Sequence, residues 1–262
     1  MKGFLPCRAA VLNTEGKVRF MSGEFPEMLE KISAIRNMLN EYSSVSSSDP
    51  ASLMAVTKFV DADRINYAIE EGGIRLIGEN RPQELVQKYP QLHLDGVSVH
   101  MIGTLQTNKV KYIIDKVDMI QSLDSLKLAA EIDRQAQKHD KKMNVLIEIN
   151  IGEEPQKGGI LPGELEAFQR QLQPLSNIRV CGLMTIGPQY AQPEAYGPCF
   201  SRMQTLFRHF SEEYLRDIEQ PLLSMGMSHS FREALLHGSN LIRVGSGIFG
   251  ERRSSPPVMP SM

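Results

Sequence analysis

The chain has 262 residues, of which 41% are hydrophobic and 23% are charged, and its formal net charge at pH 7 is -2. This balance is typical of a globular protein and excludes a disordered chain, a collagen-like repeat and a membrane span. Because the net charge is close to zero, no overall field draws the chain to nucleic acid or to an anionic membrane, so any anion site must be local.

The cysteine and histidine content bears on the compartment and on metal binding. The three cysteines (Cys7, Cys181 and Cys199) lack metal-ligand spacing, and so small and odd a set fits a reducing compartment better than a disulfide scaffold. No apolar run reaches the length of a signal-peptide core or of a membrane helix. We therefore expect a cytoplasmic protein. The six histidines are scattered, so we expect no metal site.

The two ends of the chain differ from its middle. The segment 1–24 shows no readable pattern, and the segment 253–262 is rich in proline and serine, so we expect both to be poorly ordered. Between them, apolar residues at steps of three and four over Phe25–Glu41 predict an amphipathic helix, which a serine-rich loop at Ser43–Ser48 ends. Residues 25–252 are thus expected to form the folded domain.

Eight short apolar runs rich in β-branched residues predict strands. They are Leu53–Thr57, Ile74–Gly78, Val97–Ile102, Val117–Gln121, Asn144–Asn150, Ile178–Met184, Leu222–Met225 and Leu241–Val244. Helical patterns lie between them, at Asp63–Glu71, Pro82–Tyr89, Leu105–Lys116, Ser125–His139, Pro162–Leu175, Glu194–Glu219 and Ser230–His237. This alternation is typical of right-handed βαβ units with parallel strands.

The number of strands and the chain length together predict an α/β fold, a single (β/α)8 barrel of the TIM type over residues 25–252. The helix at 25–41 is then an extra N-terminal element. An open, doubly wound sheet gives a similar alternation and remains an alternative. In both folds the chemistry lies at the carboxyl ends of the strands.

Lys58 is the first polar residue after the apolar run Leu-Met-Ala-Val-Thr, so it projects from the carboxyl end of the first predicted strand. A lysine there is either solvated or an amine nucleophile that condenses with an aldehyde. An unperturbed lysine, with a pKa of about 10.4, is almost fully protonated at neutral pH, so this chemistry needs a desolvated or positively charged neighbourhood. Arg243, on the last predicted strand, could supply that charge.

The segments 224–228 and 243–250, at the ends of the last two predicted strands, are rich in glycine and serine. In barrels, the loops after strands seven and eight frequently bind phosphate through backbone N–H groups. Ser230 and Glu233 have the spacing of a capping box, which places a helix start beside Ser228. Tight turns alone would also explain the glycines. The second segment matches G-x-G-x-x-G, but no βαβ unit follows it, so a dinucleotide site is rejected.

Two further positions lie in loops after predicted strands. Asn80 follows the second strand and could either orient a ligand group or cap a helix. Lys157 follows the fifth strand and is either solvated or placed to receive a ligand on the same rim.

Six motifs, taken in order along the chain, resemble the YggS/PROSC family of pyridoxal 5'-phosphate homeostasis proteins. They are A-V-T-K (55–58), G-E-N-R-x-Q-E (78–84), H-M-I-G-x-L-Q-x-N-K (100–109), G-L-M-T-I (182–186), L-S-M-G-M-S (223–228) and R-V-G-x-x-I-F-G (243–250). Each motif alone is weak, but together they span nearly all of residues 25–252. The barrel of that family is similar to the N-terminal domain of alanine racemase.

The resemblance implies roles for particular residues. Lys58 matches the lysine that forms an internal aldimine with the cofactor pyridoxal 5'-phosphate, and Arg243 matches the arginine that faces the pyridine nitrogen. The implied cofactor site also contains Asn80, Met225, Ser228, Gly245 and Ser246, the last three at the phosphate. A permanently charged guanidinium disfavours protonation of the ring nitrogen, which weakens the ring as an electron sink.

Three functions follow from these residues. The resemblance implies a protein that stores the cofactor as a reversible imine on Lys58 and passes it to apo-enzymes without substantial catalysis, as a monomer or weak dimer with no nucleic-acid or membrane partner. The alternative is an amino-acid racemase of the alanine racemase type, which uses a second, β-rich domain for which we expect no room after the barrel. A lysine-imine aldolase would need a general acid or base near Lys58, and none is evident.

Overall fold

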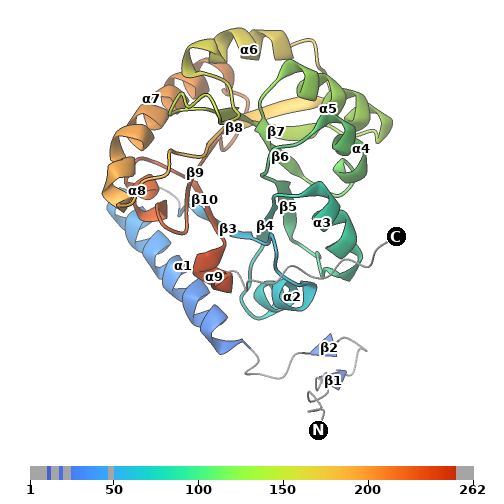
Figure 1. Cartoon of the computed structure of the whole chain (residues 1–262), viewed down its shortest axis with the longest axis vertical. Helices are drawn as coiled ribbons and strands as arrows, with labels where there is room; N and C mark the ends of the chain where they lie inside the picture. The colour runs from blue at the N-terminus through green and yellow to red at the C-terminus, as the bar shows by residue number, and fades with distance from the viewer. Residues whose placement is uncertain (1–10, 13–17, 20–24, 47–49, 252–262) are drawn as a thin grey trace.

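The strands of residues 50–251 form a closed parallel barrel of eight strands in the computed structural model (Figure 1), which describes residues 11–12, 18–19, 25–46 and 50–251. The strands are β3 (Ser52–Val56), β4 (Leu76–Glu79), β5 (Ser98–Met101), β6 (Met119–Leu123), β7 (Met143–Ile149), β8 (Ile178–Thr185), β9 (Leu222–Met227) and β10 (Leu241–Val244). Because β10 pairs with β3, the sheet has no open edge. The predicted (β/α)8 barrel is confirmed, and the doubly wound alternative is wrong.

Helices surround the barrel on its outer side (Figure 1). They are α2 (Ala62–Glu70), α3 (Pro82–Lys88), α4 (Val110–Ile113), α5 (Leu126–Lys138), α6 (Leu165–Leu172), α7 (Gly197–Tyr214), α8 (Phe231–Leu236) and α9 (Ser246–Phe249). Short 3-10 turns precede or follow four of them: η1 (Tyr89–Gln91), η2 (Thr107–Lys109), η3 (Pro162–Glu164) and η4 (Pro193–Tyr196). Local caps set some of the starts, as where the Asp61 carboxylate accepts a hydrogen bond from the Arg64 N–H at 3.0 Å before α2.

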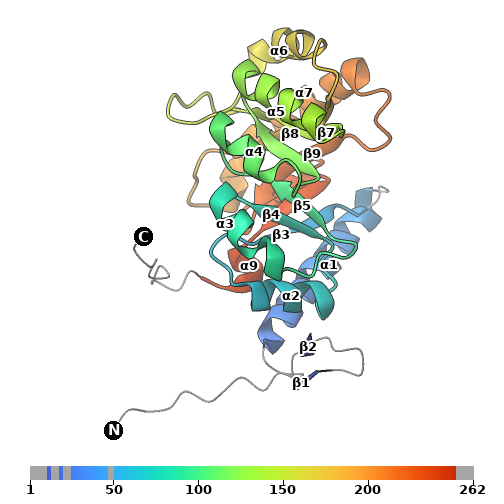
Figure 2. The same ribbon diagram turned by 90° about the vertical axis from the view of Figure 1, so that its right-hand side faces the viewer.

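The N-terminal helix α1 (Pro26–Ser46) is the extra element that the sequence predicts. Its residues Met28, Ile32, Ile35 and Leu39 are all buried. They recur at steps of three and four residues, which places them on one face of the helix. In both views α1 lies beside α9 (Figure 1 and Figure 2), a helix too short to cover the seam between β10 and β3. The side chain of Arg36 fixes α1 by donating to the carbonyls of Gly72 and Gly73, each at 2.7 Å.

Two local predictions are wrong, and one short helix is not predicted from the sequence. The helix α1 continues to Ser46, so the expected loop at Ser43–Ser48 does not begin at Ser43; helix propensity is a weak prior, and serine is only mildly unfavourable in a helix. The helix expected over 105–116 reduces to η2 and α4, because the backbone at Gln106 is extended. The four-residue helix α9 is too short to give a periodic signal.

The expectations for the two ends fall mostly outside the described residues. Of the segment 1–24, the structure describes β1 (Val11–Leu12) and β2 (Val18–Arg19), which pair in antiparallel fashion. The segment 253–262 lies entirely outside the described residues, as do Ser47 and Ser48. Among the residues that the structure describes, none of the helices is both long enough and apolar enough to cross a membrane.

Candidate functional site

The residues singled out at the strand ends come from neighbouring strands. The strand β10 pairs with β3 on one side and with β9 on the other. Lys58 therefore follows one neighbour of β10, and Ser228 follows the other. The loop at Gly245 also lies against the end of β3, since a Cβ at this glycine would be 3.4 Å from Cβ of Val56. The amine, the serine and the glycine loop thus share the carboxyl end of the barrel.

The side of β3 that faces the barrel interior leads to Lys58. Met54 and Val56 belong to an interior apolar cluster with Ile102 and Leu241. Side chains alternate between the two faces of a strand, so position 58 continues the interior face beyond the end of β3. The Lys58 side chain is half-buried there, which is the partly desolvated setting that amine chemistry requires.

A buried ion-pair cluster holds the backbone on both sides of Lys58. The Nζ atom of Lys88, on α3, donates to the carbonyls of Thr57 at 2.7 Å and Val60 at 3.3 Å. The same Nζ lies 2.5 Å from Oε1 of Glu79 and 2.9 Å from Oε1 of Glu84. The Glu79 side chain is fully buried, and burial raises its pKa while Lys88 opposes that rise. The backbone of the loop that carries Lys58 is therefore held in place by the charged Nζ of Lys88.

Two backbone N–H groups converge on one oxygen between the last two loops. The N–H groups of Gly245 and Gly247 both donate to Oγ of Ser228, each at 3.2 Å. Successive backbone N–H groups that point at one place form an anion-binding concavity. A side chain at position 247 would place its Cβ 2.7 Å from Val244 and within 3.6 Å of Ser228 Oγ, so glycine keeps this concavity open.

The turn after β9 presents Ser228 to this concavity. Gly226 has a φ of 88°, and a Cβ there would lie 2.6 Å from Cβ of Ala234, so the residue must be glycine. The helix start expected beside Ser228 is present, because α8 begins at Phe231. The capping box itself is wrong: the Ser230 hydroxyl accepts from the N–H of Met227 instead, at 3.2 Å.

Arg243 is buried in the barrel interior and held at two points. Its Nη1 donates to Oγ of Ser224 at 2.7 Å, and its Nη2 donates to the carbonyl of Thr185 at 2.8 Å. Burial lowers the pKa of Arg243 to about 10, while the negative charge of Glu148 opposes that change. The guanidinium therefore stays cationic at neutral pH and supplies a positive charge inside the barrel.

Glu148, on β7, is a titratable group that the sequence did not single out. Burial and, to a smaller extent, the nearby Asp124 raise the pKa of Glu148 to about 7, while Arg243 opposes that rise. Between its ordinary pKa and 7, the folded protein binds a proton that the unfolded chain has lost, so the free energy of unfolding falls as the pH rises through this range.

Glu148→Gln is therefore expected to stabilise the protein by up to about 3 kcal/mol at pH values above 7 and by much less near pH 5, where the folded wild type is already protonated. Urea unfolding at both pH values measures this difference. Glu164→Gln, at an exposed glutamate, is the control and should change stability by less than about 0.5 kcal/mol. Equal effects of Glu148→Gln at both pH values would contradict a raised pKa.

The four remaining singled-out residues occupy four different settings. Asn80 is half-buried after β4, and within the described residues its Oδ1 atom is buried without a hydrogen-bond partner. Met225 is fully buried in the main core, and Ser246 is exposed at the start of α9. Lys157 forms an ion pair with Glu154 at 2.6 Å and donates to a loop carbonyl. Asn80 alone of these offers an unsatisfied buried acceptor.

The residues that sequence reasoning missed are Lys88, Glu148 and the buried partners of Arg243. Lys88 has the sequence setting of an ordinary solvated helix residue. Glu148 interrupts the apolar run at residues 145–149, which is the one sequence signal that could have marked it. Over the described residues, no three His, Cys, Asp or Glu side chains gather as a metal site would require.

Comparison with known proteins shows the family of this chain. The family described as "Alanine racemase, N-terminal domain" matches residues 31–253. A "Pyridoxal phosphate homeostasis protein" of Aquifex aeolicus is 44% identical over 182 residues, which cover 69% of this chain and 78% of the relative. A protein of the same name from Escherichia coli is 32% identical over 216 residues, which cover 79% of this chain and 88% of the relative.

Solved structures show the same likeness. The structure of PipY of Synechococcus elongatus with PLP bound is 29% identical, with a TM-score of 0.74, over 85% of this chain and 100% of that chain. An alanine racemase of Clostridium difficile is 16% identical with a TM-score of 0.65, which shows the fold alone. The chain therefore belongs to the alanine racemase N-terminal domain family and, within it, to the pyridoxal phosphate homeostasis proteins.

Proposed function

We propose that this chain binds pyridoxal 5'-phosphate at the carboxyl end of the barrel formed by residues 25–252 and acts in the homeostasis and delivery of that cofactor, without substantial catalysis of its own. The names of the relatives and the PLP-bound structure of PipY support the proposal. The residues that we expect to hold the cofactor are Lys58, Asn80, Met225, Ser228, Arg243, Gly245 and Ser246.

The observation that carries the proposal is the concavity at Ser228. Two N–H groups already converge there on one oxygen, and a phosphate oxygen could accept the same two hydrogen bonds. The concavity lies against the end of β3, the strand that leads to Lys58. A phosphate ester bound there would bring the rest of the molecule to the mouth of the barrel, beside the amine.

Two further residues fit the remaining groups of the cofactor. The unpartnered Oδ1 of Asn80 can accept a hydrogen bond from a ligand hydroxyl. The cationic guanidinium of Arg243 suits a ring nitrogen that stays unprotonated. When bound, the cofactor supplies an aldehyde that condenses reversibly with a lysine amine and releases water. Arg243 keeps the ring a weak electron sink, which favours storage over carbanion chemistry.

A titration of the purified protein with pyridoxal 5'-phosphate tests the proposal. We expect visible absorbance that saturates at one equivalent and disappears on borohydride reduction. Alanine and other amino acids are then incubated with the loaded protein in deuterated water to detect exchange of the α-proton. No saturable binding would contradict the proposal, and exchange at about 1 to 1,000 per second, the usual range of enzymes, would favour a racemase instead.

The proposal extends to compartment and partners. The sparse cysteines support a cytoplasmic location. Apo-enzymes that use the same cofactor are the proposed recipients, and we propose a monomer or weak dimer. Mixing the loaded protein with such an apo-enzyme and following its activation tests delivery; activation no faster than that by an equal concentration of free cofactor would contradict it.

A further inference from the structure

A row of polar side chains crosses the barrel interior and connects the amino end of the barrel to Arg243. Its members, called the interior polar row below, are Asp118, Ser98, His100, Gln121, Ser224 and Arg243. His100, Gln121, Ser224 and Arg243 are all buried, with exposed fractions of 5% or less. Buried polar groups of this kind are costly unless each is hydrogen-bonded, so their pairing is informative.

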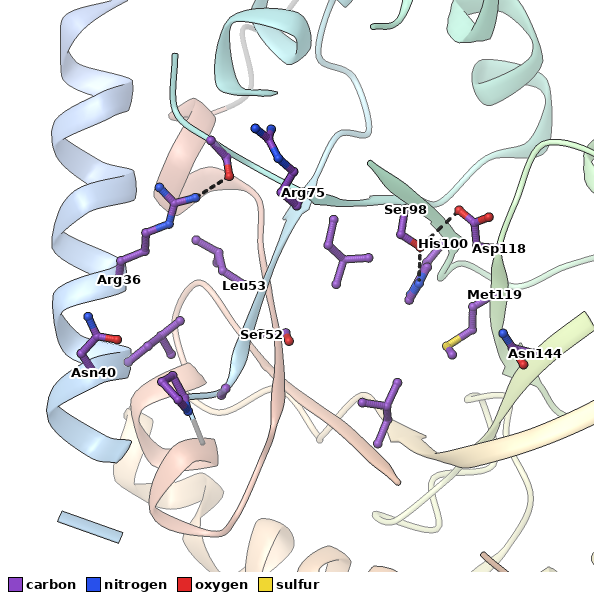
Figure 3. Close-up of a pocket in the computed structure, with 16 residues that line it drawn as sticks. Arg36, Asn40, Ser52, Leu53, Arg75, Ser98, His100, Asp118, Met119 and Asn144 are labelled. Carbon is purple, nitrogen blue, oxygen red and sulfur yellow. Dashed lines mark hydrogen bonds between the residues drawn. The ribbon is translucent and has the colours of Figure 1, made fainter. Parts of the chain in front are cut away.

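The hydrogen bonds of the row are continuous. From Arg243, Nη1 donates to Ser224 Oγ at 2.7 Å, and Ser224 Oγ donates to Gln121 Oε1 at 2.7 Å. Nε2 of Gln121 then lies 2.9 Å from Nδ1 of His100. On the other side of the ring, His100 Nε2 lies 3.1 Å from Ser98 Oγ. Ser98 Oγ donates to Oδ2 of Asp118 at 3.2 Å, and these last contacts are visible in Figure 3.

The ends of the row decide the direction of every bond between them. An arginine can only donate, and an ionised aspartate can only accept. The Ser224 hydroxyl must therefore accept from Arg243 and donate to Gln121. The Gln121 amide then donates to Nδ1 of His100, so the ring carries its proton on Nε2 and donates toward Ser98. Burial lowers the pKa of His100 to about 4, which agrees with a neutral ring.

The far end of the row is open to solvent. Asp118 is exposed, and its Oδ2 also accepts from the backbone N–H of Val99 at 2.8 Å, which fixes the carboxylate in place. Ser98, His100 and Asp118 line a cavity of about 690 Å³ at the amino ends of the strands (Figure 3). The carboxylate that ends the row therefore faces solvent, whereas the middle of the row is buried.

We propose that the interior polar row is a positioning device for Arg243, with Ser224 and Gln121 as positioning residues for the cofactor ring. The inference rests on the proposed function, since it concerns the arginine expected to face that ring. The Ser224 proton is committed to Gln121, so the hydroxyl always presents a lone pair to the guanidinium. Together with the Thr185 carbonyl, this fixes two nitrogens of one planar group and hence its orientation.

Cofactor affinity tests the positioning role. Ser224→Ala removes the acceptor of Arg243, and we expect about tenfold weaker binding of pyridoxal 5'-phosphate together with a shifted visible spectrum, the usual scale for a hydrogen bond to a charged group. Gln121→Met keeps Ser224 but leaves its proton uncommitted, so a smaller loss in the same direction is expected. Ser122→Ala is the matched control. Ser122, on β6, is fully buried like Ser224, but its hydroxyl donates to the Gly103 carbonyl, which is outside the row.

A second measurement needs no cofactor. Nitrogen NMR of the isotope-labelled, ligand-free protein identifies which ring nitrogen of His100 carries the proton, and the row predicts Nε2. A proton on Nδ1, or a positively charged ring at neutral pH, would overturn the row itself. Wild-type affinity and spectrum in Ser224→Ala would overturn its positioning role. Absence of cofactor binding in the wild type would instead contradict the proposed function, so the two failures are distinguishable.

Discussion

Replacing Lys58 with alanine is expected to remove the covalent attachment of pyridoxal 5'-phosphate while the barrel stays folded. The side chain is half-buried beyond the end of β3, and the neighbouring backbone keeps its own bonds, such as that from the Thr57 N–H to the Gly78 carbonyl at 3.0 Å. We expect complete loss of borohydride-reducible absorbance and a change in the free energy of unfolding of less than about 1 kcal/mol. The phosphate concavity is untouched, so weak, non-covalent binding should remain.

Two comparison variants separate chemistry from charge in this experiment. Lys58→Arg keeps a positive charge but has no amine that can condense with an aldehyde, so it should also lose the absorbance. Lys157→Ala removes a lysine whose Nζ is bound to Glu154 and to the Gly187 carbonyl, and it should keep the absorbance. Persistent reducible absorbance in Lys58→Ala would exclude Lys58 as the attachment point.

Lys88→Met is expected to cause the largest loss of stability, about 3–5 kcal/mol, because it leaves the buried carboxylate of Glu79 without its cation. The carbonyls of Thr57 and Val60 lose their shared donor at the same time. The loop that carries Lys58 should become less ordered, so condensation with the aldehyde should also slow. Urea unfolding and the rate of absorbance gain measure these two effects.

The control for Lys88→Met is a lysine in an exposed ion pair. Lys31 lies 3.7 Å from Glu27 on α1, and the two side chains are 43% and 85% exposed. Exposed pairs contribute little, so Lys31→Met should change stability by less than about 1 kcal/mol. A similarly small effect of Lys88→Met would show that the buried cluster does not anchor the loop.

The barrel could be predicted because the strands are short and mostly apolar, and a helical pattern lies between each strand and the next. The short elements could not be predicted from the sequence. At Gln106 the backbone stays extended, the expected helix is reduced to η2 and α4, and nothing local in the sequence marks this. The serines at the end of α1 favour a loop by their propensity alone, whereas the helix continues through them to Ser46.

The candidate site also has a part that the sequence predicts and a part that it does not. Lys58, Ser228 and Gly245 could be placed from sequence because barrels bring the carboxyl ends of their strands to one face. The interior polar row that reaches Arg243 could not be predicted, because Gln121 on β6 and Ser224 on β9 are 103 positions apart and meet only across the interior. Contacts of this kind depend on the closed barrel, whereas the loop motifs are local in the sequence.

The most direct test of the account is to load the protein with pyridoxal 5'-phosphate, reduce it with borohydride and map the labelled peptide. The account predicts a single modified residue, Lys58, in the peptide that joins β3 to α2. A label on Lys157 or on another lysine, with Lys58 unmodified, would contradict it.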